Sequence, residues 1–256
     1  MYAVMNLDPA KSPVFQDVRV RQALYWALDR EAIVKTIYFG FATVANGPIP
    51  PTLKQYYDGN VKPLYTHDPK KAGQLLDEAG WKTGSNGVRA KDGQELSFPV
   101  MVPSSDQVEI NMAQAIQAQW GKVGVKVTLQ PADLVTVLVP ALDDNHNFQM
   151  IILGESINPD PDTSIFWETS GTGNSGDYSN PALDQVMAQG NATLGATARK
   201  PIYEKVTNML LQDPPAIFLT YPQVLQAVNK RVVGFIPSKV VSRAYYLNKL
   251  ETTDGK

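Results

Sequence analysis

Residues 96–129 read LSFPVMVPSSDQVEINMAQAIQAQWGKVGVKVTL. Apolar and polar side chains alternate over 96–102, which is the period of a strand with one buried face. Asp106 and Glu109 then form a capping-box-like pair, and the apolar positions that follow them recur with a helical period. After two glycines, alternation returns over 125–129. The pattern predicts a strand, a helix and a second strand.

The same order continues along the chain. A short apolar helix is expected at 134–139, and it leads to a third strand at 148–153. Alternating strands and helices of this kind indicate an α/β fold. Pro99 has no amide hydrogen to give to a neighbouring strand, so we expect an edge position or a bulge at that residue.

Helices are also predicted outside this region. Asp17, Asp29 and Asp68 each precede an apolar-periodic segment and are expected to act as N-caps. One later helix begins at Asn180-Pro181, and another ends at 213–215, which read Asp-Pro-Pro.

Three further strands are predicted outside the central pattern. The first covers 1–7, and the others cover 216–221 and 226–233, near the end of the chain.

Composition limits the classes of function. The chain has 256 residues, 43% of them hydrophobic and 19% charged, with a formal net charge of −2. These values are typical of a globular protein, and they lack the excess of lysine and arginine that marks a nucleic-acid-binding surface. No apolar run approaches the roughly 20 residues that span a bilayer. We therefore expect no nucleic-acid partner.

The scarcity of soft ligands excludes several chemistries. The chain has no cysteine and only two histidines, His67 and His146. Thiol catalysis, thiolate metal sites and metal sites built on several histidines are thereby excluded. We expect neither a metal nor a cofactor. The first residues carry no basic segment or cleavage site, so the chain is either cytoplasmic or a piece of something longer.

Two loops invite a chemical interpretation. Glu155, Asp160 and Asp162 could act as paired carboxylates or hold a hard metal ion. Asp-Pro repeats are also turn formers, whose carboxylates accept hydrogen bonds from their own downstream amides, and this alternative is favoured. The stretch 171–173, Gly-Thr-Gly, lacks the strand, helix and lysine of a phosphate loop, so a surface loop is favoured there.

Position in the predicted sheet favours one binding site. In open α/β sheets, ligands bind in the crevice beyond the carboxyl ends of the strands. Ser104 and Ser105 follow the first middle strand, and Glu155, Ser156 and Asn158 follow the third. Because the two serines also precede a helix N-terminus, an anionic group would be favoured beside them. This is a binding site without catalytic groups.

One aromatic residue extends this candidate site. Trp167 lies in the loop region beyond the third strand, where an aromatic ring could line a ligand cleft. The alternative is a plain packing role.

Several motifs, in the same order along the chain, resemble the family 5 extracellular solute-binding proteins of bacterial ABC importers, the dipeptide, oligopeptide and nickel group. The motifs are 15–24 (FQDVRVRQAL), 27–34 (ALDREAIV), 47–51 (GPIPP), Tyr65, 68–72 (DPKKA), 75–76 (LL), 78–81 (EAGW), 124–127 (GVKV), 178–181 (YSNP) and Asp184. The resemblance covers nearly the whole chain.

The resemblance implies a fold and a role. It implies a lobe like those of type II periplasmic binding proteins, with a mixed sheet flanked by helices. Residues 1–233 would form the C-terminal lobe, and 234–256 a tail that returns to an N-terminal lobe absent from this sequence. The role would be a non-catalytic substrate-binding component, whose partners are a solute, that lobe and an ABC permease. Its location would be periplasmic or extracellular, with lipid anchoring of the full-length protein as an option.

The residues expected to select the ligand differ from those of the best-known members of this family. Peptide binders of this family carry a Trp and then an Asp just past the third strand, where this chain reads Leu-Gly-Glu-Ser-Ile-Asn at 153–158. The solute is therefore expected to be peptide-like or another small polar molecule. Two alternatives are the ligand-sensing lobe of a transcriptional regulator and, least favoured, a hydrolase using Glu155 and Asp160.

Overall fold

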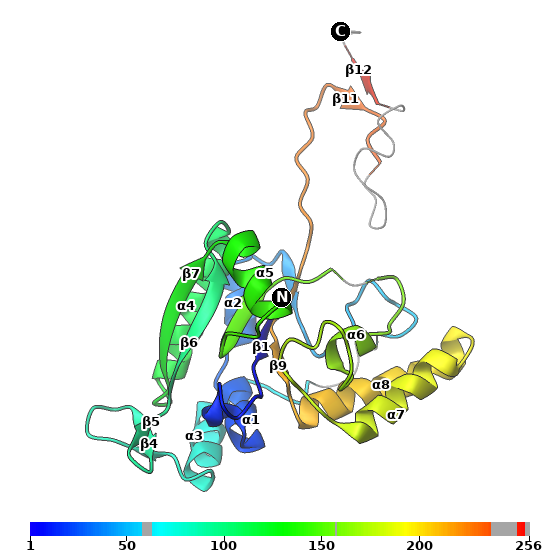
Figure 1. Cartoon of the computed structure of the whole chain (residues 1–256). Coiled ribbons are helices and arrows are strands. Elements are labelled where there is room, and N and C mark those ends of the chain that lie inside the picture. Colours follow the sequence, from blue (N-terminus) through cyan, green and yellow to red (C-terminus); the bar gives the residue numbers. More distant parts are fainter. Residues whose placement is uncertain (58–62, 157, 237–249, 254–256) are drawn as a thin grey trace. The chain divides into compact units, whose positions relative to one another are not determined.

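Five strands form the central sheet, in the order β7-β6-β8-β1-β9 (Figure 1). Strands β6, β7 and β8 run parallel, and β1 lies antiparallel to β8 and β9. Their bounds are β1 (Tyr2–Met5), β6 (Ser97–Pro103), β7 (Lys126–Ala132), β8 (Met150–Leu153) and β9 (Ala216–Phe218). The predicted α/β order and the mixed sheet are confirmed.

This computed structural model describes residues 1–57, 63–156, 158–236 and 250–253. The chain divides into two units, Met1–Pro222 and Gln223–Lys256. The central sheet and all the helices of the described residues belong to the first unit.

Helices flank the sheet of the first unit, and α7 and α8 lie side by side (Figure 1). Their bounds are η1 (Pro13–Phe15), α1 (Val18–Trp26), α2 (Arg30–Thr36), α3 (Pro69–Glu78), α4 (Gln107–Gly121), η2 (Leu134–Leu138), α5 (Val139–Asp143), α6 (Ser164–Trp167), α7 (Pro181–Ala192) and α8 (Ala196–Gln212). No helix among the described residues is long and apolar enough to cross a membrane.

Short polar side chains set where the main helices begin. The carboxylates of Asp17, Asp29 and Asp68 each accept a hydrogen bond from a backbone amide of the first helical turn, as predicted. Asn180 does the same for α7. These bonds satisfy amides that have no partner inside a helix, so the starting points can be read from the sequence.

Strand β8 of the sheet is buried on both faces. Alternate residues of β8 point in opposite directions: Met150 and Ile152 join the larger apolar cluster, which includes residues of α1, α3, α4, α7 and α8. Ile151 and Leu153 join a smaller cluster with residues of η2 and α5. Burial on both sides explains why this strand is apolar at every position rather than alternating.

Strand β6 is not an edge strand, so the position predicted from Pro99 was wrong. It lies between β7 and β8, and its register with β7 is unbroken. However, β8 pairs with β6 only at Val100 and Met101. Pro99 is therefore outside the stretch that β8 reaches, and an inner strand can carry a proline at this position.

The closing strands also differ from the prediction. The stretch 216–221 divides at Leu219 into β9 and β10 (Thr220–Pro222), because β10 pairs with β2 (Ala42–Val44) rather than with the central sheet. Residues 226–231 form no strand, although alternation predicted one over 226–233. A separate antiparallel meander joins β3 (Lys82–Thr83), β4 (Arg89–Lys91) and β5 (Gln94–Glu95).

The second unit contains one short antiparallel pair, β11 (Val232–Val233) with β12 (Glu251–Thr252). Most of the tail predicted over 234–256 lies outside the described residues. The boundary at residue 233 and the return of the tail to another lobe stay predictions.

Candidate functional site

The topology brings the predicted site residues to one edge of the sheet. Strands β6 and β8 are parallel neighbours, with Val100 opposite Met150 and Met101 opposite Ile151. Their carboxyl ends therefore emerge together. We call this the carboxyl edge; it comprises residues 104–109, which follow β6 and begin α4, together with residues 154–156 and 158, which follow β8.

The predicted binding residues of the carboxyl edge are all exposed: Ser104, Ser105, Glu155, Ser156 and Asn158. The Ser104 amide donates to the carbonyl of Ala132 at 2.8 Å, which fixes the turn to the end of β7. The Ser156 amide donates to Glu155 Oε1 at 3.1 Å. The fold thus presents these side chains to solvent together, and contact with a solute stays a prediction for each of them.

The start of α4 is less open to anions than predicted. Asp106 Oδ1 accepts the amides of Val108 at 2.8 Å and Glu109 at 3.2 Å. The carboxylate of the chain itself thus already occupies the positive end of the helix dipole. An anionic ligand group beside Ser104 and Ser105 would meet this negative charge.

Glu109 belongs to this edge, and the capping role predicted for its side chain was wrong. Its Oε2 is buried and has no hydrogen-bond partner among the described residues, so the reciprocal half of the capping box is missing. Its Oε1 lies 3.7 Å from where a Cβ on Gly154 would stand. The side chain therefore extends from the first turn of α4 toward the end of β8. No sequence signal separates this orientation from capping, since both use a glutamate three residues after the cap.

The charge of Glu109 is destabilised in the fold. Burial, with the nearby carboxylate of Asp106 as a second cause, raises the pKa of Glu109 to about 7. The ammonium group of Met1 acts in the opposite direction. It donates a hydrogen bond to the Thr220 carbonyl at 2.8 Å, and burial lowers its own pKa to about 6.

The Asp-Pro loop forms turns, as favoured from the sequence. Asp160 Oδ1 accepts the Asp162 amide, and Asp162 Oδ1 accepts the Ser164 amide, both at 2.9 Å. Both oxygens of Asp160 also bind the guanidinium of Arg199, at 2.7 and 2.8 Å. The hydrogen bond to Arg199 lowers the pKa of Asp160. This carboxylate is paired rather than available as a base.

Trp167 packs inside the protein. It is 4% exposed, and its ring meets Tyr2 and Phe218 edge-on at centroid distances of 5.9 and 5.7 Å. Its Nε1 is buried without a partner among the described residues. The ring also borders an enclosed cavity of about 10 Å³, room for about one water molecule. A ligand contact by Trp167 stays a prediction.

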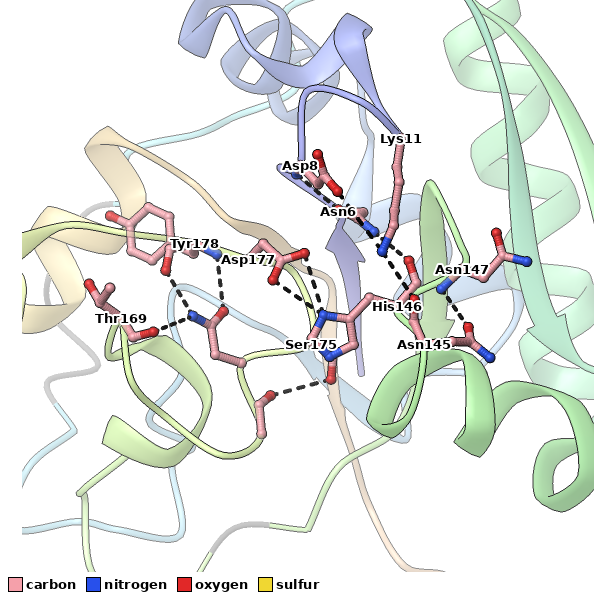
Figure 2. A network of polar contacts seen from close by, with 12 residues as sticks. Asn6, Asp8, Lys11, Asn145, His146, Asn147, Thr169, Ser175, Asp177 and Tyr178 are labelled. Atoms are coloured by element: carbon pink, nitrogen blue, oxygen red, sulfur yellow. Dashed lines mark hydrogen bonds and ion pairs between the residues drawn. The ribbon is translucent and has the colours of Figure 1, made fainter.

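The opposite end of β8 carries a polar network of a different kind (Figure 2). Asn6 Nδ2 donates to the His146 carbonyl at 2.8 Å, and Lys11 Nζ donates to the Asn145 carbonyl at 3.0 Å. The imidazole Nδ1 of His146 lies 3.2 Å from Asp177 Oδ1. These contacts join three loops that are far apart in the sequence.

A buried amide holds the third of these loops. Asn174, 8% exposed, donates through Nδ2 to the Tyr178 carbonyl at 2.8 Å and accepts the Tyr178 amide through Oδ1 at 3.1 Å. We call this region the amino edge; it comprises residues 6–11, 145–149 and 169–178. Its hydrogen-bonded side chains connect loops, and Gln149 Oε1 is buried there without a partner among the described residues.

These features define a class. A mixed sheet with exposed polar loops at the carboxyl ends of its parallel strands has the architecture of an α/β ligand-binding domain. The family described as "Bacterial extracellular solute-binding proteins, family 5 Middle" matches residues 1–177. The chain belongs to this family.

Curated relatives are similar over most of the chain. Protein XP55 of Streptomyces lividans is 32% identical over 232 residues, which cover 88% of this chain and 41% of the relative. The oligopeptide-binding protein AppA of Bacillus subtilis is 30% identical over 229 residues, with 88% and 42% covered. The chain thus spans less than half the length of these relatives.

Solved structures show the same lobe. AppA from Bacillus subtilis in complex with a nonapeptide superimposes with a TM-score of 0.86 at 28% identity, over 98% of this chain and 50% of that one. NikZ from Campylobacter jejuni in complex with Ni(L-His) gives 0.81 at 26% identity, over 98% and 51%. The predicted likeness to periplasmic binding proteins is confirmed.

Proposed function

We propose that this chain is one lobe of the substrate-binding component of an ABC importer, and that it binds a peptide-like or other small polar solute at its carboxyl edge. The proposal rests on one observation: exposed polar side chains follow the ends of two neighbouring parallel strands, at 104–105 after β6 and at 155, 156 and 158 after β8. Family membership supports the general role. The relatives named above include one bound to a peptide and one bound to a nickel complex.

The proposed mechanism is domain closure. The chain matches half of each solved relative, so the solute would lie between this lobe and a second one. A ligand that contacts both lobes favours the closed form, and the membrane permease would recognise that form. Such a protein works outside the cytoplasm, in the periplasm or at the cell surface. The lipid anchor stays a prediction.

The lobe on its own should bind weakly, because the contacts of the second lobe are lacking. We expect dissociation constants on the order of 1 mM, which correspond to about −4 kcal/mol. Saturation-transfer NMR detects such binding on the small molecule. The probes are one mixture of di- and tripeptides and one of free amino acids.

The proposal predicts saturation transfer to at least one of these mixtures. No transfer to either would contradict it, and tight stoichiometric binding by calorimetry would contradict the half-cleft arrangement. The sensory-lobe alternative gains nothing from the relatives, which are named as binding proteins. A helix-turn-helix segment encoded upstream of Met1 would favour it over an importer.

A further inference from the structure

Glu109 is the one acidic side chain of the carboxyl edge with a buried, unpartnered carboxylate oxygen among the described residues. A carboxylate removed from water without a hydrogen-bond donor costs free energy, and native structures keep few such groups. Those that persist call for an explanation, and a functional site is a common one. The helix offers Glu109 no relief, because Asp106 takes the first-turn amides of Val108 and Glu109.

The position of Glu109 places it within the proposed crevice. Oε1 is 3.7 Å from the Cβ position of Gly154, the first residue after β8, while the backbone of Glu109 belongs to the first turn of α4. The side chain thus bridges the two segments that carry Ser105 and Glu155. The side chain of Met1 also lies here, with its Sδ 2.8 Å from the Cβ position of Gly154.

The surroundings add negative charge. The carboxylate of Asp106 is near enough to raise the pKa of Glu109, and Glu155 and Glu109 both act on the ammonium of Met1. That ammonium is the positive group that the structure places beside Glu109, and its hydrogen bond goes to the Thr220 carbonyl. The local field favours a cation and opposes an anion.

We infer that Glu109 is a specificity-determining residue of the carboxyl edge, and that it accepts hydrogen bonds from a cationic group of the solute, a primary ammonium or a guanidinium. The inference rests on the proposed function, since it names the chemical class that the same site selects. A charged N–H donor gives the buried oxygen the partner it lacks, and charge-assisted bonds of this kind are the stronger ones. It also corrects the anionic preference expected from the helix N-terminus alone.

The test compares two tripeptides that differ in charge at one side chain. N-acetyl-Ala-Lys-Ala and N-acetyl-Ala-norleucine-Ala, whose blocked N-termini leave the lysine ammonium as the one cationic group that differs, are titrated into the ¹⁵N-labelled chain at pH 8, where Glu109 is ionised, and binding is followed on its amide signals. We expect the lysine peptide to bind about tenfold more tightly, the ratio expected from one charge-assisted contact.

Two variants locate the preference. Glu109→Gln keeps the shape of the side chain and removes its charge, so it should bring the two peptides to equal affinity. Glu204→Gln is the matched control: Glu204 lies on α8 beside Lys200, away from the carboxyl edge in the sequence and the fold, and its loss should leave the preference intact.

The outcomes separate the two proposals. Equal binding of both peptides by the unchanged chain, or a preference that survives in Glu109→Gln, would overturn the role of Glu109 and leave the proposed function standing. No binding of either peptide would count against both. A preference that disappears at pH 5.5, where Glu109 is protonated, would support the role further.

Discussion

The two ends of β8 use polar side chains in opposite ways. At the amino edge, Asn174 pairs with both backbone groups of Tyr178, and His146 faces Asp177 (Figure 2). At the carboxyl edge, Glu109 keeps a buried oxygen unpaired, and Ser105 has no hydrogen bond among the described residues. The amino edge also has one buried oxygen without a partner among the described residues, Gln149 Oε1. Polar groups that bind one another stabilise the fold, whereas polar groups without partners leave capacity for a ligand. This contrast supports the proposal that the solute binds at the carboxyl edge, while the hydrogen bonds of the amino edge hold the fold together.

The largest change in the free energy of unfolding is expected for a substitution at the amino edge. Asn174→Ala leaves the amide and carbonyl of Tyr178 buried without partners, so we expect a loss of about 2–3 kcal/mol in the free energy of unfolding. Urea denaturation followed by circular dichroism measures it. Asn158→Ala is the matched control at the carboxyl edge; its side chain is exposed, and the change should stay within about 0.5 kcal/mol. Equal losses in both variants would remove the contrast.

The next substitution, Glu109→Gln, is expected to raise the free energy of unfolding rather than to lower it. The ordinary pKa of 4.5 for Glu109 rises to about 7 in the folded chain. Between these pH values the folded state holds a proton that the unfolded state has released, so stability falls as the pH rises through this range. Glu109→Gln abolishes that loss. We expect the variant to be more stable by about 1–2 kcal/mol at pH 8, after allowance for solvent screening.

The difference in the free energy of unfolding between Glu109→Gln and the unchanged chain should depend on pH if the ionisation of Glu109 is its cause. At pH 4, Glu109 is protonated in both states, so its ionisation no longer separates the variant from the unchanged chain. The ammonium of Met1 titrates in the same range and is coupled to Glu109, so the difference between the two proteins reports the titration of this pair. Urea midpoints at pH 4, 6 and 8 give the comparison. A variant less stable than the unchanged chain at pH 8 would show that the Glu109 charge is satisfied in the fold.

A smaller loss of stability is expected for the contact between His146 and Asp177 at the amino edge, which is an ion pair when the imidazole is protonated. Asp177→Asn removes the charge that faces His146 while keeping a side chain that tolerates the positive φ of 52° at this position. Both groups are partly exposed, so the loss should be less than about 1 kcal/mol and should shrink further in 1 M salt. Thermal melts at low and high salt check both points; a loss that salt leaves unchanged would point to packing instead of charge.

The smallest effect on stability is expected at Ser105. Ser105→Ala removes an exposed hydroxyl with no partner among the described residues, so the free energy of unfolding should change by less than about 0.5 kcal/mol. If the residue serves a ligand, the same change weakens binding of the peptide mixture in saturation-transfer NMR. A destabilised protein with unaltered binding would assign Ser105 to the fold.

Local chemistry made much of the fold predictable. Four helices begin at an aspartate whose short carboxylate accepts hydrogen bonds from the free amides of the first turn: Asp17, Asp29, Asp68 and Asp106. The alternation of 96–102 similarly identified β6. The predictions from sequence failed where a strand's position depends on pairing with strands far away in the sequence. The break between β9 and β10 arises from pairing with β2, and the inner position of β6 depends on how far β8 extends along it.

The carboxyl edge was predictable in outline only. The parallel pairing of β6 and β8 places Ser104, Ser105, Glu155, Ser156 and Asn158 after the ends of neighbouring strands, and ligand binding by these residues stays a prediction. The rule that ligands bind beyond parallel strands could not find Glu109, whose spacing from Asp106 fits a capping box equally well. Only tertiary packing separates a capping role from the observed orientation, because the side chain of Glu109 lies beside Met1 and the end of β8.

The most direct test of the contrast is to map where a solute binds. ¹H–¹⁵N spectra of the chain are recorded during titration with the mixture of di- and tripeptides. We predict that the amides which shift most belong to residues 104–109 and 154–156 of the carboxyl edge, while residues 6–11 and 174–178 of the amino edge do not move. Shifts concentrated at the amino edge, or spread evenly over the surface, would contradict the assignment of binding to the carboxyl ends of β6 and β8.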